Sequence, residues 1–112
     1  MISTHVLDTT HGWPATGVAV LLEQVGDAGA RREIGRDMTD RDGRVRELIP
    51  SGLSVAAGTY CLTFETGDYF AALGVVAFYP RVSITFTVRE PSQHHHVPLL
   101  LSPYGYSTYR GT

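Results

Sequence analysis

The amino-acid sequence predicts an all-β fold, namely an antiparallel sandwich of two sheets that carries one short helix. Apolar and polar residues alternate along most of the 112 residues, which is typical of strands with one buried face. Turn-forming residues separate the alternating runs, and only one stretch has the composition of a helix. Many short strands accompanied by a single small helix favour a β-sandwich.

The clearest of the predicted strands covers residues 82–88, where Val82, Ile84, Phe86 and Val88 alternate with polar side chains. The same alternation, less regular, predicts strands at 3–9, 17–25 and 59–65 and a weaker one at 32–39. Turn signals separate them at 11–17, 39–43 and 102–105.

One stretch, TGDYFAALG at residues 66–74, breaks the alternation and predicts the helix. Thr66 is a suitable N-cap, helix formers follow it, and Gly74 is a natural residue just beyond a helix C-terminus.

Bulk composition limits the possible functions. A chain of this length suits one compact domain, so we predict a single domain at residues 1–112. The net charge of −2 gives no electrostatic reason to expect nucleic acid or an acidic membrane as a partner. All nine basic residues are arginine, which excludes Schiff-base and pyridoxal-phosphate chemistry because both need a lysine amine.

Several features indicate a cytoplasmic protein. Cys61 is the only cysteine, so no intrachain disulfide can form. The N-terminal MISTHVLDTT has neither the basic nor the apolar region of a signal peptide, and no apolar run is long enough to span a membrane. No base is identified beside Cys61, so we interpret it as a structural thiol rather than a nucleophile.

Two polar residues in the first half of the chain are candidates for chemistry. In the strand at 3–9, Ser3, His5 and Leu7 share one face, so His5 lies in the middle of a sheet surface. Arg44 directly follows Asp42-Gly43, a hairpin turn signal. Taken alone, His5 fits a histidine hydrogen-bonded to a neighbour and Arg44 fits a solvated turn residue.

The C-terminal segment QHHHVPLLLSPYGYSTYRGT adds further candidates. In a strand, His94, His96 and Pro98 point to one face, and Leu99 and Leu101 point to the core. Because proline cannot donate to a sheet ladder, this strand is expected near an edge or with a gap at Pro98. The three histidines raise the alternative of a metal site, although adjacent strand histidines face opposite ways and no nearby Cys or carboxylate completes a zinc ligand set.

Three stretches together resemble a known family. STHVLDT near the start, DGR in the middle and HVPLLLSPYGYSTYRG at the end are similar to the transthyretin-like proteins, and more narrowly to the 5-hydroxyisourate hydrolases. The resemblance extends from Ser3 to Thr112, and the C-terminal motif is its most specific part. It implies a two-sheet sandwich with one short helix, assembled as a homotetramer whose active sites lie in a channel between subunits.

The resemblance also implies the site residues. The matching catalytic positions are His5, Arg44 and His96, and the matching substrate-binding positions are the last four residues, Tyr109, Arg110, Gly111 and Thr112. The chain departs from the commonest pattern at two places: Thr112 stands where serine is usual, which keeps the hydroxyl and adds a methyl group, and His95 stands where tyrosine is frequent.

The reaction implied is the ring-opening hydrolysis of 5-hydroxyisourate to 2-oxo-4-hydroxy-4-carboxy-5-ureidoimidazoline in urate catabolism, without cofactor or metal. A water must lose a proton, the oxyanion must be stabilised and the leaving nitrogen must be protonated. Histidine suits these proton transfers, so we expect His5 or His96 to be the general base, with Arg44 and Arg110 binding the ring. The sequence leaves open which histidine it is.

Two other functions compete with this one. A transthyretin-like carrier would bind a small hormone in the same channel without catalysis, although the resemblance implies that carriers lack the paired histidines. A metal-binding or structural sandwich would use His94 to His96 as a surface patch.

Overall fold

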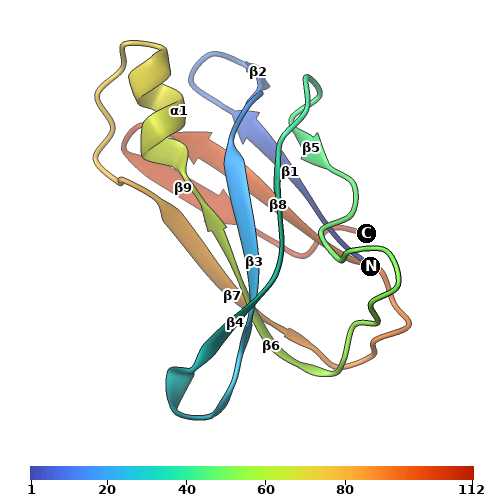
Figure 1. The fold of residues 1–112 in the computed structure, drawn as a ribbon. Helices are drawn as coiled ribbons and strands as arrows, with labels where there is room; N and C mark the ends of the chain where they lie inside the picture. Colours follow the sequence, from blue (N-terminus) through green and yellow to red (C-terminus); the bar gives the residue numbers. More distant parts are fainter.

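Two β-sheets pack face to face in the computed structural model of the chain, which describes residues 1–112 (Figure 1). The elements in chain order are β1 (Ile2–Asp8), β2 (Trp13–Pro14), β3 (Ala19–Val25), the short 3₁₀ helix η1 (Asp27–Gly29), β4 (Arg31–Met38), β5 (Arg44–Val45), β6 (Gly58–Phe64), α1 (Thr66–Ala72), β7 (Val82–Val88), β8 (His95–Ser102) and β9 (Gly105–Thr108). The predicted sandwich with one short helix is therefore confirmed.

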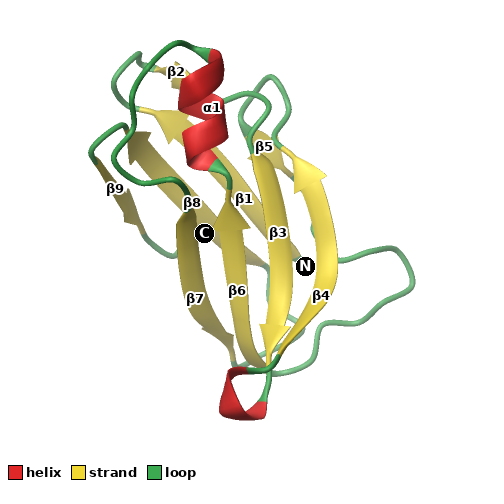
Figure 2. Ribbon diagram, turned by 60° about the vertical axis from the view of Figure 1, so that its left-hand side comes forward, coloured by secondary structure: helices red, strands yellow, loops and turns green.

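The first sheet has the order β2-β1-β8-β9, and β5 also pairs with β1. The second sheet has the order β4-β3-β6-β7 and lies in front of the first in Figure 2. All strand pairs are antiparallel except β1 with β8, which run parallel. This parallel pair joins the two ends of the chain in the middle of one sheet.

The core lies between the sheets, where the alternating apolar residues of both face inward. On β7, Val82, Ile84 and Val88 are buried while the intervening polar residues are exposed, as the alternation predicts. The fully buried large side chains come from both sheets and from α1, namely Phe64, Phe70, Ile2, Leu22, Leu62, Leu99, Leu101, Val6, Val18, Val20, Val82 and Val88.

Helix α1 closes one end of the sandwich (Figure 2). The predicted N-cap was wrong by one residue, since Thr66 is the first helical residue and Glu65 precedes it without a side-chain capping bond. At the other end, the Gly74 N–H donates to the Ala71 carbonyl and the Val75 N–H to the Phe70 carbonyl. This is the Schellman pattern, and it uses the left-handed backbone of Gly74 (φ 72°) as predicted.

Strand β8 lies between β1 and the edge strand β9, so it is next to an edge but is not itself an edge strand. The other alternative, a gap at Pro98, is confirmed. The β9 ladder ends where Thr108 pairs with Leu99, and the next bridge joins Gly111 to His96. Pro98 therefore lies in the interval where the neighbouring segment offers no backbone partner for it.

No helix of this structure is both long and apolar enough to cross a membrane.

Candidate active site

The parallel pairing of β1 and β8 brings the first candidate residues together. Ser3 lies opposite His96 and His5 lies opposite Pro98 in this register. Because strand side chains alternate, Ser3 and His5 share the face opposite to that of Val6, which is in the core. The predicted common face of Ser3 and His5 is thus confirmed, and His96 joins it from the other end of the chain.

Arg44 reaches the same face because β5 pairs antiparallel with β1, with Arg44 directly opposite His5. The predicted hairpin at Asp42-Gly43 was wrong: β4 pairs with β3 in one sheet and β5 with β1 in the other, so this turn carries the chain between sheets. A two-residue hairpin signal describes local backbone preference, and it does not determine which strand the chain pairs with next.

The turn itself is held tightly. Gly43 has a left-handed backbone (φ 76°), and a Cβ there would come 2.5 Å from the Val6 carbonyl oxygen. The Val6 N–H donates to the Gly43 carbonyl at 2.7 Å, and one carboxylate oxygen of Asp40 accepts the backbone N–H of Arg44 at 3.0 Å. That bond is the largest factor lowering the pKa of Asp40, opposed by desolvation. Arg44 therefore begins β5 from a fixed backbone position.

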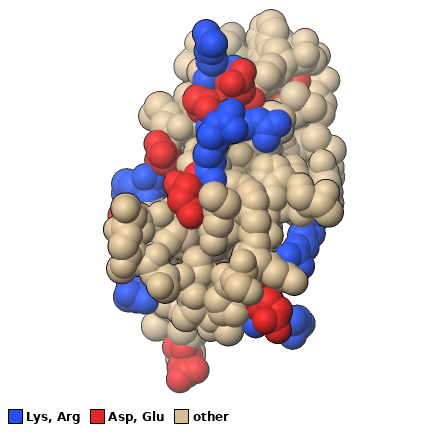
Figure 3. Space-filling view, turned by 90° about the vertical axis from the view of Figure 1, so that its right-hand side faces the viewer, with Lys and Arg blue, Asp and Glu red and all other residues tan.

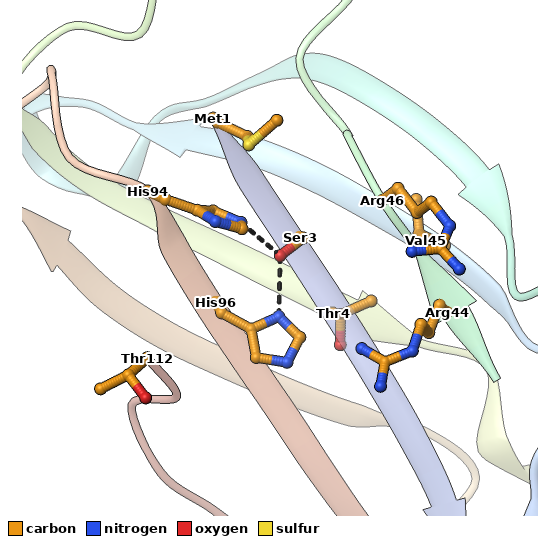
Figure 4. Close-up of a pocket in the computed structure, with 9 residues that line it drawn as sticks. All are labelled: Met1, Ser3, Thr4, Arg44, Val45, Arg46, His94, His96 and Thr112. Atoms are coloured by element: carbon orange, nitrogen blue, oxygen red, sulfur yellow. Dashed lines mark hydrogen bonds between the residues drawn. The ribbon is translucent and has the colours of Figure 1, made fainter. Parts of the chain in front are cut away.

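A cavity of about 340 Å³ opens on this face (Figure 4). Its wall combines residues from β1, β5, β8, their flanking segments and the end of the chain, namely Met1, Ser3, Thr4, Arg44, Val45, Arg46, His94, His96 and Thr112. Figure 4 shows the His96 ring between Thr112 and the Arg44 guanidinium. Three predicted residues, Arg44, His96 and Thr112, thus share one cavity.

His96 is held in a form that can accept a proton. Burial lowers its pKa below the ordinary 6.5, and the positive charges of Arg44, His94 and His5 lower it further. Since a lowered pKa leaves an imidazole neutral at neutral pH, one ring nitrogen of His96 keeps its lone pair.

His5 does not line this cavity in a single chain. Burial is the main factor lowering its pKa, followed by the charge of Arg44, while a hydrogen bond to the Asp42 backbone and the carboxylates of Asp40 and Asp42 oppose the change. His5 is therefore electrostatically coupled to both Arg44 and His96 without standing on the cavity wall.

The Ser3 hydroxyl is a feature that sequence reasoning missed. Its Oγ lies 2.7 Å from Nε2 of His94 and 2.7 Å from Nδ1 of His96 (Figure 4). With Nδ1 of His96 engaged by Ser3, Nε2 of His96 is the nitrogen left for a ligand. Ser3 was placed on the correct face by the strand alternation, but no signal in the sequence linked it to residues more than ninety positions away.

The sequence also contained signals for two other residues of the cavity wall, Arg46 and His94, that were not used to predict the site. Arg46 follows Arg44 by two positions, so strand alternation places both on one face. His94 was considered only as a metal ligand. The structure brings together no group of three or more His, Cys, Asp or Glu side chains that could hold a metal ion, and His94 and His96 share Ser3 instead.

The last four residues, which were predicted to bind substrate, do not all line the same cavity. The Gly111 N–H donates to the His96 carbonyl at 2.9 Å, and a Cβ at Gly111 would come 2.5 Å from Cδ2 of His96. Only glycine lets the chain pass this close to the ring, and Thr112 then reaches the cavity wall.

Tyr109 and Arg110, in contrast, line a second cavity of about 230 Å³ together with Phe86 and His95. Arg110 donates from Nη2 to the side-chain oxygen of Gln93 at 3.2 Å. His96 also lines this second cavity. The structure of one chain therefore places Tyr109 and Arg110 beside His96, but not on the cavity wall that Arg44 and Thr112 share.

Comparison with known proteins agrees with this arrangement. Residues 2–111 match the HIUase/Transthyretin family. A curated protein of Rhizobium meliloti named 5-hydroxyisourate hydrolase 2 is 46% identical over 115 residues, which cover 99% of this chain and 95% of the relative.

Solved structures are similar over the same length. The 5-hydroxyisourate hydrolase of Klebsiella pneumoniae has a TM-score of 0.85 at 39% identity, covering 99% of this chain and 98% of that one. Sea bream transthyretin, solved in complex with thyroxine, has a TM-score of 0.90 at 29% identity, covering 99% of this chain and 94% of that one. Since the family match and the relatives extend over nearly all of its residues, this chain belongs to the HIUase/Transthyretin family.

Proposed function

We propose that this protein hydrolyses 5-hydroxyisourate, opening its six-membered ring by histidine-assisted attack of water. The observation that carries the proposal is the meeting of His96, Arg44 and Thr112 around one cavity, with His96 kept neutral by its surroundings. Hydrolase relatives at 39–46% identity over the whole chain support the choice of substrate. The cavity volume of about 340 Å³ suits a small molecule.

His96 is the general base in this scheme. It lines the cavity, its Nδ1 is engaged by Ser3, and Nε2 is therefore the nitrogen that takes a proton from the attacking water. A base whose pKa is near or below neutrality is in its reactive form at physiological pH.

Arg44 stabilises the negative charge that develops on the attacked carbonyl. Its guanidinium carries a permanent charge and a planar set of donors, which suit a carbonyl oxygen that becomes an oxyanion. His5 lies opposite Arg44 on the neighbouring strand, and repulsion between the protonated rings of His5 and His96 lowers the pKa of His96 further. Thr112 and Gly111 close the wall beside the His96 ring.

We also propose a homotetramer with active sites at subunit interfaces. Strands β7 and β9 are each an edge strand of their sheet, and exposed sheet edges are places where another chain can pair. Beside them lies an aromatic cluster in which Phe78 packs edge-on against Tyr79, and Tyr79 against Tyr106. Tyr109 and Arg110, which follow β9 and line the second cavity beside His96, would lie at such an interface.

The surface charge is compatible with a small-molecule ligand. On the face shown in Figure 3, positive and negative side chains are interspersed in the upper part, and the middle and lower part is largely uncharged with charges at its margins. That face offers no continuous positive surface of the kind that attracts a nucleic-acid backbone. The single domain and the cytoplasmic location stay predictions, and cell fractionation tests the latter.

The function is tested by a decay assay. Urate oxidase generates 5-hydroxyisourate, and its absorbance is followed with and without the protein. We expect a saturable acceleration of the decay. The alternative is a carrier, favoured by the similarity to thyroxine-bound transthyretin. Tight binding of thyroxine by calorimetry, with no acceleration of decay, would select the carrier and reject the hydrolase.

A further inference from the structure

The Ser3 hydroxyl bridges two imidazoles on the proposed catalytic face. Its Oγ is 2.7 Å from both His94 Nε2 and His96 Nδ1, and Ser3 is only 5% exposed. A hydroxyl has one hydrogen, so it can donate to only one of the two rings, and it then accepts from the other. When Ser3 donates to a ring in this way, the three groups form a directed chain of hydrogen bonds with two possible directions.

The two directions give His96 different chemistry. In the first, His96 Nδ1–H donates to Ser3, Ser3 donates to His94 Nε2, and His96 Nε2 bears a lone pair that accepts a proton. In the second, His94 Nε2–H donates to Ser3, Ser3 donates to His96 Nδ1, and His96 Nε2–H is a proton donor. Reversing the direction of these hydrogen bonds thus converts His96 from a base to an acid without moving a ring.

We propose that Ser3 relays protons between His96 and His94 during hydrolysis, so that His94 holds the proton taken from the attacking water. The inference rests on the proposed function. As water adds, its proton goes to His96 Nε2, the Nδ1 proton of His96 goes to Ser3 Oγ, and the Ser3 hydroxyl proton goes to His94 Nε2. His94 is then an imidazolium, and His96 is neutral with its proton on Nε2.

The second half of the reaction reverses these transfers. The leaving nitrogen takes the proton from His96 Nε2 as its bond to carbon breaks. Ser3 returns its proton to His96 Nδ1, and His94 Nε2 returns a proton to Ser3. All three groups regain their first state, so the relay adds and removes no net proton.

The charges around the cavity favour storage on His94. A positive charge on His96 would be half-buried beside Arg44 and His5, both of which lower its pKa, and Arg46 also lines this cavity. His94 is exposed, so its imidazolium is solvated and less costly. The two rings stand 6.1 Å apart between centroids, which one hydroxyl spans.

A substitution at His94 separates a relay from simple positioning. In His94→Gln the amide still bonds to Ser3 but accepts no proton at neutral pH. If Ser3 only fixes the ring of His96, this variant keeps the wild-type kcat. The relay predicts a kcat about ten- to a hundredfold lower, within the usual contribution of one proton-transfer group.

Variants of Ser3 give the matched comparison. We expect Ser3→Ala to lose a similar factor and Ser3→Thr, which keeps the hydroxyl, to restore most of the rate. The double variant Ser3→Ala/His94→Gln should be little slower than either single variant, because both substitutions interrupt the same series of proton transfers. Circular dichroism checks that each variant is folded. If Ser3→Ala unfolds, the kcat of His94→Gln alone distinguishes the relay from simple positioning.

The decisive readout is the proton inventory, measured as kcat in mixtures of H₂O and D₂O with 5-hydroxyisourate prepared before mixing. Wild type should give a curved plot, because several protons move together, and His94→Gln a straight one. The relay is overturned if His94→Gln turns over at the wild-type rate or gives the wild-type inventory. Failure of the wild type to accelerate the decay would instead reject the proposed function.

Discussion

At the scale of single residues, the surroundings of His96 decide its protonation. Burial makes the charged ring unfavourable, and the cations nearby act in the same direction. Among these charges, Arg44 has the largest effect on the pKa of His96, and it shares the cavity wall with His96. The residue that steadies an oxyanion in our scheme therefore also keeps the base neutral.

The pH dependence follows from these directions. As pH falls, His96 is protonated and can no longer accept a proton, so kcat/KM should fall with a midpoint below the ordinary pKa of 6.5. Arg44→Gln removes the main positive charge and should move this midpoint up, besides slowing the reaction. Arg41→Gln, in the exposed turn, is the control. An unchanged midpoint in Arg44→Gln would contradict the coupling.

His95, unlike His96, is a buried histidine with a ring nitrogen that has no hydrogen-bond partner. It is 5% exposed, its Nδ1 has no hydrogen-bond partner, and burial together with the charge of Arg110 lowers its pKa. An unpaired buried polar atom costs about 1–3 kcal/mol. We expect His95→Phe to raise the free energy of unfolding at neutral pH by about 1 kcal/mol.

The increase in the free energy of unfolding caused by His95→Phe should be larger at acidic pH. Because the pKa of His95 is lower in the folded than in the unfolded chain, the unfolded chain binds the proton more readily, and native stability falls as pH drops below about 6.5. His95→Phe removes this loss. Urea unfolding at about pH 7.5 and pH 5.5 measures both effects, and a variant less stable than wild type at both would contradict them.

At the scale of elements, the end of the chain is built into the site through Gly111. A Cβ there would meet Cδ2 of His96 at 2.5 Å and Cγ of Pro98 at 3.2 Å. Since the segment after β9 is held to β8 by few backbone bonds, the added methyl should displace it or the ring. Packing of the core is not involved, so stability should change little.

Gly111→Ala should therefore lower kcat about tenfold or more, because small misplacements of catalytic groups are costly, with a nearly unchanged melting temperature. Gly105→Ala is the matched control on β9, where a Cβ would be 3.7 Å from the nearest atom, Ser102 Oγ. Equal activity of the two variants would show that the chain end does not position His96.

The same elements explain how much of the fold was predictable. The strands at 17–25, 59–65 and 82–88 were found because period-two alternation reflects one buried face, and the helix was found because its end signals are local. The parallel pairing of β1 with β8 and the passage of the turn at 39–43 between sheets were not, because each depends on partners distant in the chain.

The site was predictable to a similar degree. Resemblance alone pointed to Arg44, His96 and Thr112, which the structure brings together around one cavity. It also pointed to Tyr109 and Arg110, whose role stays a prediction because they line a second cavity that shares only His96 with the first. The hydrogen bonds of Ser3 span 91 and 93 positions. No local pattern encodes a contact that only the strand register creates.

At the scale of the whole molecule, the edge strands β7 and β9 and the aromatic cluster beside them form the proposed subunit contact. Tyr106 is 43% exposed on β9 and packs against Tyr79. An arginine there would place a charge in the proposed subunit contact, where burying it unpaired is unfavourable.

We expect wild type to sediment at four times the 12.2 kDa of one chain and Tyr106→Arg to shift toward smaller species and lose activity. Leu53→Arg, at a more exposed apolar side chain (56%) in the loop between β5 and β6, should leave the mass unchanged. A monomeric wild type with full activity would reject the proposed assembly.

The most direct measurement is the turnover of 5-hydroxyisourate by His96→Ala beside His11→Gln, a histidine outside the cavity. We predict that His96→Ala keeps its fold and loses about 10²–10⁴-fold in kcat, the range expected for a lost general base, while His11→Gln stays near wild type. A folded His96→Ala variant with wild-type turnover would contradict the central claim that His96 activates the water.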